Sequence, residues 1–247
     1  EVDADASAAA YRDLVDHWDP WVSEEAAVLD GLGPDLLLSD VPVLPLAAAG
    51  RLGIRAAALC SLNWAGIYRT YCGDRPEAPA VLHRLYEAYG AAEVFLAPEP
   101  MMPMDDMPNL RRIGPIARRG RRRDLHALLD LPRDERLALL TFGGIDGERP
   151  GASWPAVAGW RFLVTGEQAA DHPAMLQLPD GLVAFPDLLA SVDAVVTKIG
   201  YGTFTEAACN GTAVVYQSRP GWPEDPPLRR WVEHQARARR VSAAEMR

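Results

Sequence analysis

The chain has 247 residues, a formal net charge of −9 and a pI near 5.1. Its length suits one large or two modest α/β domains, and two is our expectation. The acidic balance argues against nucleic acid or an anionic membrane as a main partner, because both require a basic surface. Cys60, Cys72 and Cys209 form no CxxC pair, so neither a disulfide framework nor a zinc cage is indicated. With no signal peptide or integral membrane segment in view, we expect a cytoplasmic enzyme whose oligomeric state stays open.

The first half of the chain alternates predicted helices with short apolar strands. Apolar side chains at helical spacing indicate one or two helices within residues 5–32. The strand after them ends at Ser39-Asp40 and is expected to be a buried parallel strand, because its apolar residues are continuous. The expected elements are helices within 43–50, 64–71 and 81–89, and strands at 36–38, 55–60 and 94–97.

A Met- and Pro-rich segment, residues 98–115, is expected to be an irregular connection. It is followed by the basic run ARRGRRRD at 117–124. An exposed, solvated linker is the favoured interpretation of this run, and a phosphate-binding patch is the alternative. The predicted organisation is a first domain at 1–117, a linker at 118–130 and a second domain at 131–247.

The second half repeats the alternation of strand and helix that is typical of doubly wound α/β folds. Its most informative stretch runs from Ala190 to Asp225. There we expect a tight glycine turn, a helix capped by Thr203 or Thr205 with Glu206 in its first turn, and a stop at Asn210-Gly211. The other expected elements are strands at 137–142, 162–165, 181–184, 192–196 and 212–216, and a short helix at 186–190.

Ligands of open parallel sheets bind beyond the carboxyl ends of the strands, which makes the residues there the candidate site. Glycines let backbone N–H groups approach a diphosphate, and a helix N-terminus adds partial positive charge. Lys198 could add a full charge, and the Glu206 carboxylate could accept both hydroxyls of a ribose. Each glycine alone is better explained as a plain turn, so their joint occurrence after successive strands carries the prediction. These glycines are Gly143, Gly144, Gly200 and Gly202.

Three motifs carry a resemblance to a known family. They are KIGYGT at 198–203 with its spaced Glu206, Arg219 with the Glu224-Asp225-Pro226 loop, and Phe142-Gly143-Gly144. Together they resemble the nucleotide-sugar-binding half of GT-B glycosyltransferases. The closest likeness is to the glycosyltransferase-like domain of plant arabinokinases and its free-standing bacterial relatives. Residues 34–64 are similar to the matching N-terminal half.

The resemblance implies an α/β, GT-B type fold with two Rossmann-like doubly wound parallel-sheet domains facing a cleft. It also implies an incomplete N-terminal domain, because nothing before Glu1 matches the first βαβ unit or its Gly-rich, His-containing loop. For the donor, it implies contacts from Gly143-Gly144 and residues 200–203 to the diphosphate, from Glu206 to the ribose and from the backbone around Phe185 to the base. The remaining implied donor-binding residues are Lys198, Tyr201, Thr203, Arg219, Glu224 and Asp225.

A general base is harder to assign, because Ser61 and Ala65 depart from the pattern of the family. Asp40 is the acidic candidate at a strand end in the first half, although capping the following turn is an equal alternative. No metal site and no cofactor are expected, because the histidines lack metal-ligand spacing and the helix dipole and cations neutralise the leaving group. Trp64, Tyr68, Trp222 and Trp231 could line a cleft for an apolar acceptor or simply pack in the core.

The leading hypothesis is therefore a metal-independent, hexosyltransferase-like glycosyltransferase. It would move a sugar from a nucleotide-diphosphate donor, such as a UDP-sugar, to the hydroxyl or amine of a small-molecule acceptor. Two alternatives stay open. One is a nucleotide-sugar hydrolase or epimerase that uses the same donor pocket. The other is a non-catalytic nucleotide-sugar-binding domain.

Overall fold

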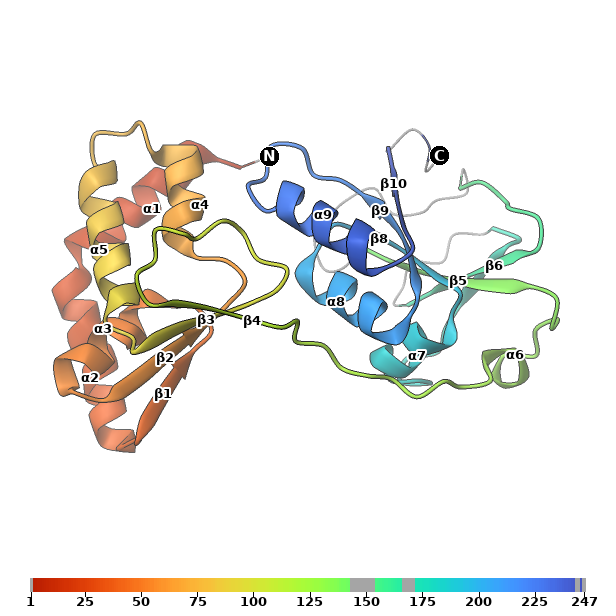
Figure 1. Ribbon diagram of the computed structural model, residues 1–247, viewed down its shortest axis with the longest axis horizontal. Coiled ribbons are helices and arrows are strands. Elements are labelled where there is room, and N and C mark those ends of the chain that lie inside the picture. Colours follow the sequence, from red (N-terminus) through yellow and green to blue (C-terminus); the bar gives the residue numbers. More distant parts are fainter. Residues whose placement is uncertain (1, 143–153, 166–171, 243–244, 246–247) are drawn as a thin grey trace. The chain divides into compact units, whose positions relative to one another are not determined.

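The computed structural model describes residues 2–142, 154–165, 172–242 and 245. The chain divides into two compact units, Glu1–Pro115 and Ile116–Arg247. Each unit is built on its own parallel sheet, as the ribbon shows (Figure 1). No helix in the described part of the chain is long and apolar enough to cross a bilayer.

The first unit has a four-stranded sheet of order β1-β2-β3-β4, in which every neighbouring pair is parallel. Its core includes Leu46, Leu85 and Phe95, all nearly inaccessible to solvent. The elements of this unit are α1 (Ala4–Asp16), α2 (Trp18–Leu32), β1 (Leu36–Ser39), α3 (Val43–Leu52), β2 (Arg55–Leu59), α4 (Trp64–Cys72), α5 (Ala78–Gly90), β3 (Val94–Pro98) and β4 (Leu110–Ile113).

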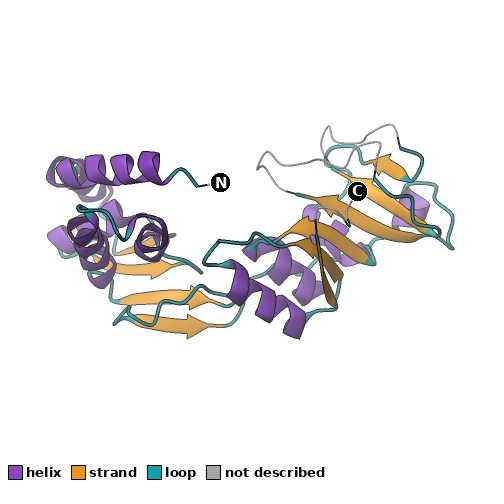
Figure 2. Cartoon of the chain, turned by 90° about the horizontal axis from the view of Figure 1, so that it is seen from above, coloured by secondary structure: helices purple, strands orange, loops and turns teal. Residues whose placement is uncertain are grey.

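The helices of the first unit lie on one face of its sheet (Figure 2). Strand residues alternate between the faces, and those on the helix side, such as Ala56, Ala58 and Phe95, are buried. On the opposite face Leu36 and Leu38 are 55% and 57% exposed. The prediction of a buried strand at 36–38 was therefore wrong, because β1 is an edge strand with one face uncovered among residues 2–115. Strand β4 lies within the segment expected to be irregular.

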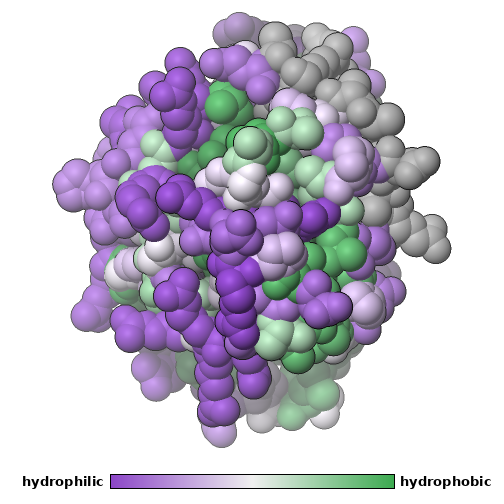
Figure 3. All heavy atoms as spheres, turned by 90° about the vertical axis from the view of Figure 1, so that its right-hand side faces the viewer, coloured by the Kyte–Doolittle hydropathy of each residue, from purple (hydrophilic) through white to green (hydrophobic). Residues whose placement is uncertain are grey.

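The second unit has a six-stranded parallel sheet of order β10-β9-β8-β5-β6-β7. One face packs against α7, α8 and α9 through a core that includes Leu139, Phe204 and Tyr216. Figure 3 shows a mostly hydrophilic surface on one face of this unit, with smaller apolar areas between. Its elements are α6 (Leu125–Leu128), β5 (Arg136–Thr141), β6 (Trp160–Val164), β7 (Met175–Gln177), α7 (Phe185–Ser191), β8 (Ala194–Lys198), α8 (Tyr201–Asn210), β9 (Ala213–Gln217), α9 (Asp225–Gln235) and β10 (Ala238–Val241).

One predicted strand of the second unit is wrong. Residues 181–184 form a turn in which Gly181 has φ 71° and the Leu182 N–H donates to the Pro179 carbonyl. The strand that pairs with β6 is instead β7, which lies just before this turn. The short apolar run at 181–184 has the composition of a strand, but the left-handed glycine at its start is incompatible with extended pairing.

The basic run after the first unit is anchored to the second one. We call residues 116–124 the strap; in Figure 1 it passes the ends of α8 and α7. The Arg121 N–H donates to Asp187 Oδ1 at 2.8 Å, and the Arg123 guanidinium pairs with the same carboxylate. A β-carbon at Gly120 would lie 1.9 Å from the Pro186 carbonyl oxygen, so only glycine fits there. The strap is thus hydrogen-bonded to the second unit, while its arginines are exposed, as the prediction of a solvated segment requires.

Candidate functional site

The strand order of the second unit reverses beside β5. The chain runs from β5 outward to β6 and β7, then returns to the other side of β5 as β8. Ligands of open α/β sheets bind outside the carboxyl ends of the strands at such a reversal. β5 and β8 end there together, with Thr141 paired to Thr197. Gly143 and Gly144 follow β5 in the sequence and lie outside the described residues.

Helix α8 begins directly beyond β8. Gly200 is its N-cap with an extended backbone (φ −176°), and no side chain caps the helix. A β-carbon at Gly200 or Gly202 would meet no atom of the described residues within 4 Å, so packing among these residues does not require either glycine. With respect to the described residues, the space at both glycines is open, which suits a helix N-terminus whose backbone N–H groups bind an anion.

The predicted start of α8 was too late by three or five residues, because the N-cap is Gly200 and not Thr203 or Thr205. Tyr201 is the first helical residue, which places Thr203 third and Thr205 fifth. The Thr205 hydroxyl donates to the carbonyls of Tyr201 and Gly202 and caps nothing. Glu206 is therefore in the second turn and not in the first. The predicted stop is confirmed, because Gly211 follows the helix in the left-handed conformation with φ 73°.

Two cations lie near each other at the carboxyl ends of β8 and β9. Burial lowers the pKa of Lys198, and the positive charge of Arg219 lowers it further. Lys198 is the only lysine in the sequence. No ion pair to Lys198 or Arg219 occurs among the residues that the structure describes. An anion bound here would relieve the repulsion between the two positive charges.

Two acidic residues of the following loop have different environments. Burial raises the pKa of Glu224, while a hydrogen bond with Tyr201 and the charge of Arg219 oppose the rise. The Asp225 carboxylate is already used, because its Oδ2 accepts hydrogen bonds from the Ser218 hydroxyl and the Arg219 N–H, both at 2.6 Å. The Arg219 guanidinium carbon lies 4.0 Å from the ring centroid of Trp222. Asp225 thus holds the loop that carries Arg219, whereas the Glu224 carboxylate has a hydrogen bond with Tyr201 and lies within reach of the Arg219 charge.

Glu206 has a partner that sequence reasoning did not supply. Its Oε1 accepts a hydrogen bond from Arg118 Nε at 2.8 Å, across 88 positions of sequence. The arginine run was noticed in the sequence, but the fold is required to show that its first arginine reaches α8. Phe185, expected near the base, is the first residue of α7 and packs half-buried against the apolar core of the unit.

In the first unit, Asp40 follows β1 and is exposed. The next residue, Val41, is buried and has φ 80°, an unusual conformation for a β-branched residue. Cys60 follows the neighbouring strand β2, and burial raises its thiol pKa to about 11, with a hydrogen bond and charge from Asp40 adding to the effect. The Cys60 thiol therefore stays protonated at neutral pH and partners the Asp40 carboxylate.

An apolar cavity of about 490 Å³ lies in the same unit. Its walls come from α1, α2, α5 and the first residues of α3 and α4. Trp64 at the start of α4 is 41% exposed, whereas Tyr68, one turn later, is buried in the core. The Tyr89 hydroxyl braces the wall, because it accepts from the Trp64 N–H and donates to the Val41 carbonyl. The lining residues are Ala10, Tyr11, Leu14, Glu25, Pro42, Val43, Leu44, Pro45, Trp64 and Leu85.

Within the described ranges, no group of three or more His, Cys, Asp or Glu side chains is arranged to hold a metal ion. The candidate site of the second unit is instead made of cations, a helix N-terminus and acidic hydrogen-bond acceptors. Such a set can bind a phosphorylated ligand that also carries hydroxyl groups.

Comparison with known proteins places this geometry in context. No family model matches the chain. L-arabinokinase of Arabidopsis thaliana is 26% identical over 218 residues, which are 85% of this chain and 20% of that protein. The chain therefore spans about a fifth of the length of this curated relative.

The solved structures that match the chain include glycosyltransferases. The glycotransferase of kitacinnamycin matches with a TM-score of 0.62 and 20% identity over 96% of this chain and 70% of its own. CalG4, the calicheamicin glycosyltransferase, has a TM-score of 0.60 and 17% identity over 96% and 69%. UGT89C1 of Arabidopsis thaliana, solved complexed with UDP, has a TM-score of 0.55 and 15% identity over 96% and 66%. The chain has the α/β fold of GT-B glycosyltransferases.

Proposed function

We propose that the protein is a glycosyltransferase that takes a sugar from a nucleotide-diphosphate donor, with the donor bound by the second unit. The observation that carries the proposal is the pair Lys198 and Arg219 beside the uncapped N-terminus of α8, at the strand-order reversal of the sheet. In glycosyl transfer, negative charge accumulates on the departing diphosphate. Fixed cations and helix N–H groups at this point stabilise the transition state more than the ground state.

In this proposal the other donor-binding residues contact different parts of the nucleotide sugar. Glu206 accepts the ribose hydroxyls, the backbone around Phe185 contacts the base, and Glu224 binds hydroxyls of the sugar. Asp225 supports the Arg219 loop. Gly143 and Gly144 complete the diphosphate contacts, and neutralisation by the protein itself makes a bound metal unnecessary. The UDP complex among the structural neighbours supports a uridine nucleotide as the first donor to try.

We propose an apolar or aromatic small molecule as acceptor, bound in the cavity of the first unit. The cavity is lined almost entirely by apolar side chains and has the volume of a small-molecule site. Asp40 is the proposed base for the acceptor hydroxyl or amine. Replacing Trp64 by Ala should raise the acceptor KM and leave donor binding unchanged; an unchanged KM would exclude this cavity as the acceptor site.

Calorimetric titration with uridine, guanosine and thymidine diphosphates tests the donor site. Glu206→Ala should weaken binding by about 1–3 kcal/mol, because ribose hydroxyls lose their acceptor. A wild-type protein that binds no nucleoside diphosphate would overturn the proposal.

A second candidate is donor binding without transfer. The matched part of the L-arabinokinase is about a fifth of that chain, so a segment of this kind can occur within a larger protein that is named as a kinase. Nucleotide release from a UDP-sugar separates the candidates: a binding domain would hold the donor intact with or without acceptors, whereas a hydrolase would release nucleotide without any acceptor.

A further inference from the structure

The ion pair between Arg118 and Glu206 uses one oxygen of the glutamate. Arg118 Nε donates to Oε1, and the other oxygen, Oε2, has no hydrogen-bond partner among the described residues. The Glu206 side chain is 11% exposed, whereas that of Arg118 is 72% exposed. A nearly buried carboxylate is thus fixed at one oxygen and available for hydrogen bonds at the other.

The backbone at Arg118 and Gly120 is held in place by the side chain of Asn210. The Asn210 side chain at the end of α8 donates to the Arg118 carbonyl at 3.1 Å and accepts from the Gly120 N–H at 2.9 Å. Gly120 is packed so closely against Pro186 that no side chain fits. The strap therefore presents Arg118 to Glu206 in a preorganised position.

Stability does not account for this ion pair. A guanidinium as exposed as that of Arg118 contributes little to folding, because water and salt screen its charge. What the contact does is to restrict the rotamer of the Glu206 side chain through a charge-assisted hydrogen bond.

Building on the proposed function, we infer that Arg118 is a positioning residue for donor recognition. It would hold Glu206 so that the carboxylate meets both the 2′- and the 3′-hydroxyl of the ribose. The chain would then select ribonucleotides over 2′-deoxyribonucleotides, and this selectivity would depend on the strap.

The test is a double-mutant cycle read as a selectivity ratio. Uridine and guanosine diphosphates and their 2′-deoxy analogues are titrated into wild type, Arg118→Ala, Glu206→Ala and the double variant. We expect wild type to bind the ribonucleotide about tenfold more tightly than its deoxy analogue, the usual loss for one hydrogen bond to a charged group. Arg118→Ala should bring this ratio near one, and it should not change the ratio further when Glu206 is already Ala.

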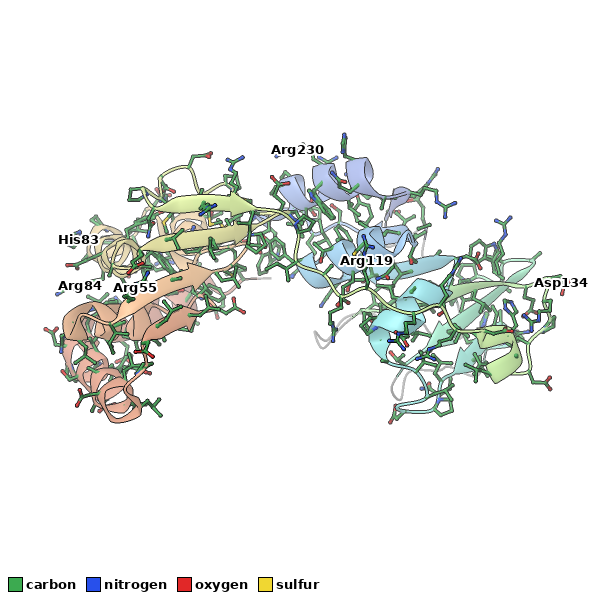
Figure 4. All side chains as sticks on the ribbon, turned by 60° about the horizontal axis from the view of Figure 1, so that its bottom comes forward. Arg55, His83, Arg84, Arg119, Asp134 and Arg230 are labelled. Atoms are coloured by element: carbon green, nitrogen blue, oxygen red, sulfur yellow. The ribbon has the colours of Figure 1, made fainter. Side chains whose placement is uncertain are left out.

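Arg119 offers a matched control, because it is the adjacent arginine on the strap and is exposed (Figure 4). Arg119→Ala should keep the wild-type ratio, and Arg118→Lys should keep part of it, since a lysine can donate one hydrogen bond. The ratio of the ribonucleotide affinity to the deoxyribonucleotide affinity cancels any direct attraction of Arg118 for phosphate, because both ligands carry the same diphosphate. Thermal unfolding shows that each variant is folded.

The outcomes separate this inference from the proposed function. Nucleotide binding with a ratio of one in wild type, or a full ratio in Arg118→Ala, would overturn the role of Arg118 and leave the donor site standing. If Arg118→Ala and Glu206→Ala changed the selectivity ratio independently, so that their effects added in the double variant, the role of Arg118 would also be overturned. If wild type binds no diphosphate, the proposed function fails and the inference fails with it.

Discussion

Arg219 lies close enough to Lys198 for its positive charge to add to burial in lowering the pKa of the lysine. The two residues come from neighbouring strand ends, β9 and β8, which pair up to Lys198 and Gln217. Placing two like charges together costs free energy in the empty site. That cost is offset when an anion binds, which is why we propose a diphosphate site here.

The pKa of Lys198 can be measured directly, because it is the only lysine. Reductive ¹³C-methylation labels Lys198 and the N-terminal amine. Titration by NMR should give Lys198 a pKa below that of an ordinary lysine, and Arg219→Ala should move it upward. An ordinary pKa in wild type, unaffected by the Arg219 substitution, would show that the two charges do not interact.

Nucleoside diphosphate affinity should depend on pH through the same residue. Deprotonation removes the positive charge of Lys198, so affinity should fall as pH rises, at lower pH than for an unperturbed lysine. Lys198→Met should bind more weakly at neutral pH and lose this alkaline dependence. An alkaline dependence that persists in Lys198→Met would assign it to another group.

Glu224→Gln should separate the phosphate part of the donor from its sugar. The substitution removes a negative charge near Arg219, so UDP alone should bind a few-fold more tightly, as expected for one partly screened charge. The additional affinity of a UDP-sugar over UDP should fall, because the carboxylate no longer accepts sugar hydroxyls. Parallel titrations of UDP and a UDP-hexose measure both effects, and equal changes in the two affinities would exclude sugar contact.

Gly120→Ala should detach the strap. The added methyl group would meet backbone atoms of Pro186 and Asp187, which cannot move without disturbing α7. We expect a loss of roughly 1–3 kcal/mol in the free energy of unfolding, the usual cost of overpacking. Gly114→Ala is the control, because nothing lies within 4 Å of its β-carbon. Equal stability of the two variants in urea would mean that the strap is not packed as described.

Sequence patterns predicted the parts of the fold that depend on local signals. The β-branched run before Lys198, the stop at Asn210-Gly211 and the alternation of helix and strand were sufficient to place β8, α8 and β9. The burial of Leu36 and Leu38 was misjudged, because the sequence of an apolar strand does not show whether its outer face is covered by other residues or exposed to solvent. The start of α8 was misjudged because threonines are good caps, yet here Gly200 occupies that position without a side chain.

The candidate site was predictable in its residue types and less so in its partners. Lys198, Arg219, Glu206 and Glu224 were identified from strand ends and motif spacing. The contacts that define their roles link distant residues, as between Arg118 and Glu206, and periodicity carries no information about such pairs. The hydrogen bonds from Ser218 and Arg219 to the Asp225 carboxylate likewise depend on the backbone path of residues 218–225.

The central claim is that a nucleoside diphosphate binds at the carboxyl ends of β8 and β9. The most direct test follows the ¹³C-methyl signal of Lys198 during titration with UDP and the other ribonucleoside 5′-diphosphates. The account predicts a saturable shift with at least one diphosphate, a rise in the pKa of Lys198 on binding, and no shift with the corresponding nucleoside. A Lys198 signal and pKa that stay unchanged with every diphosphate would contradict it.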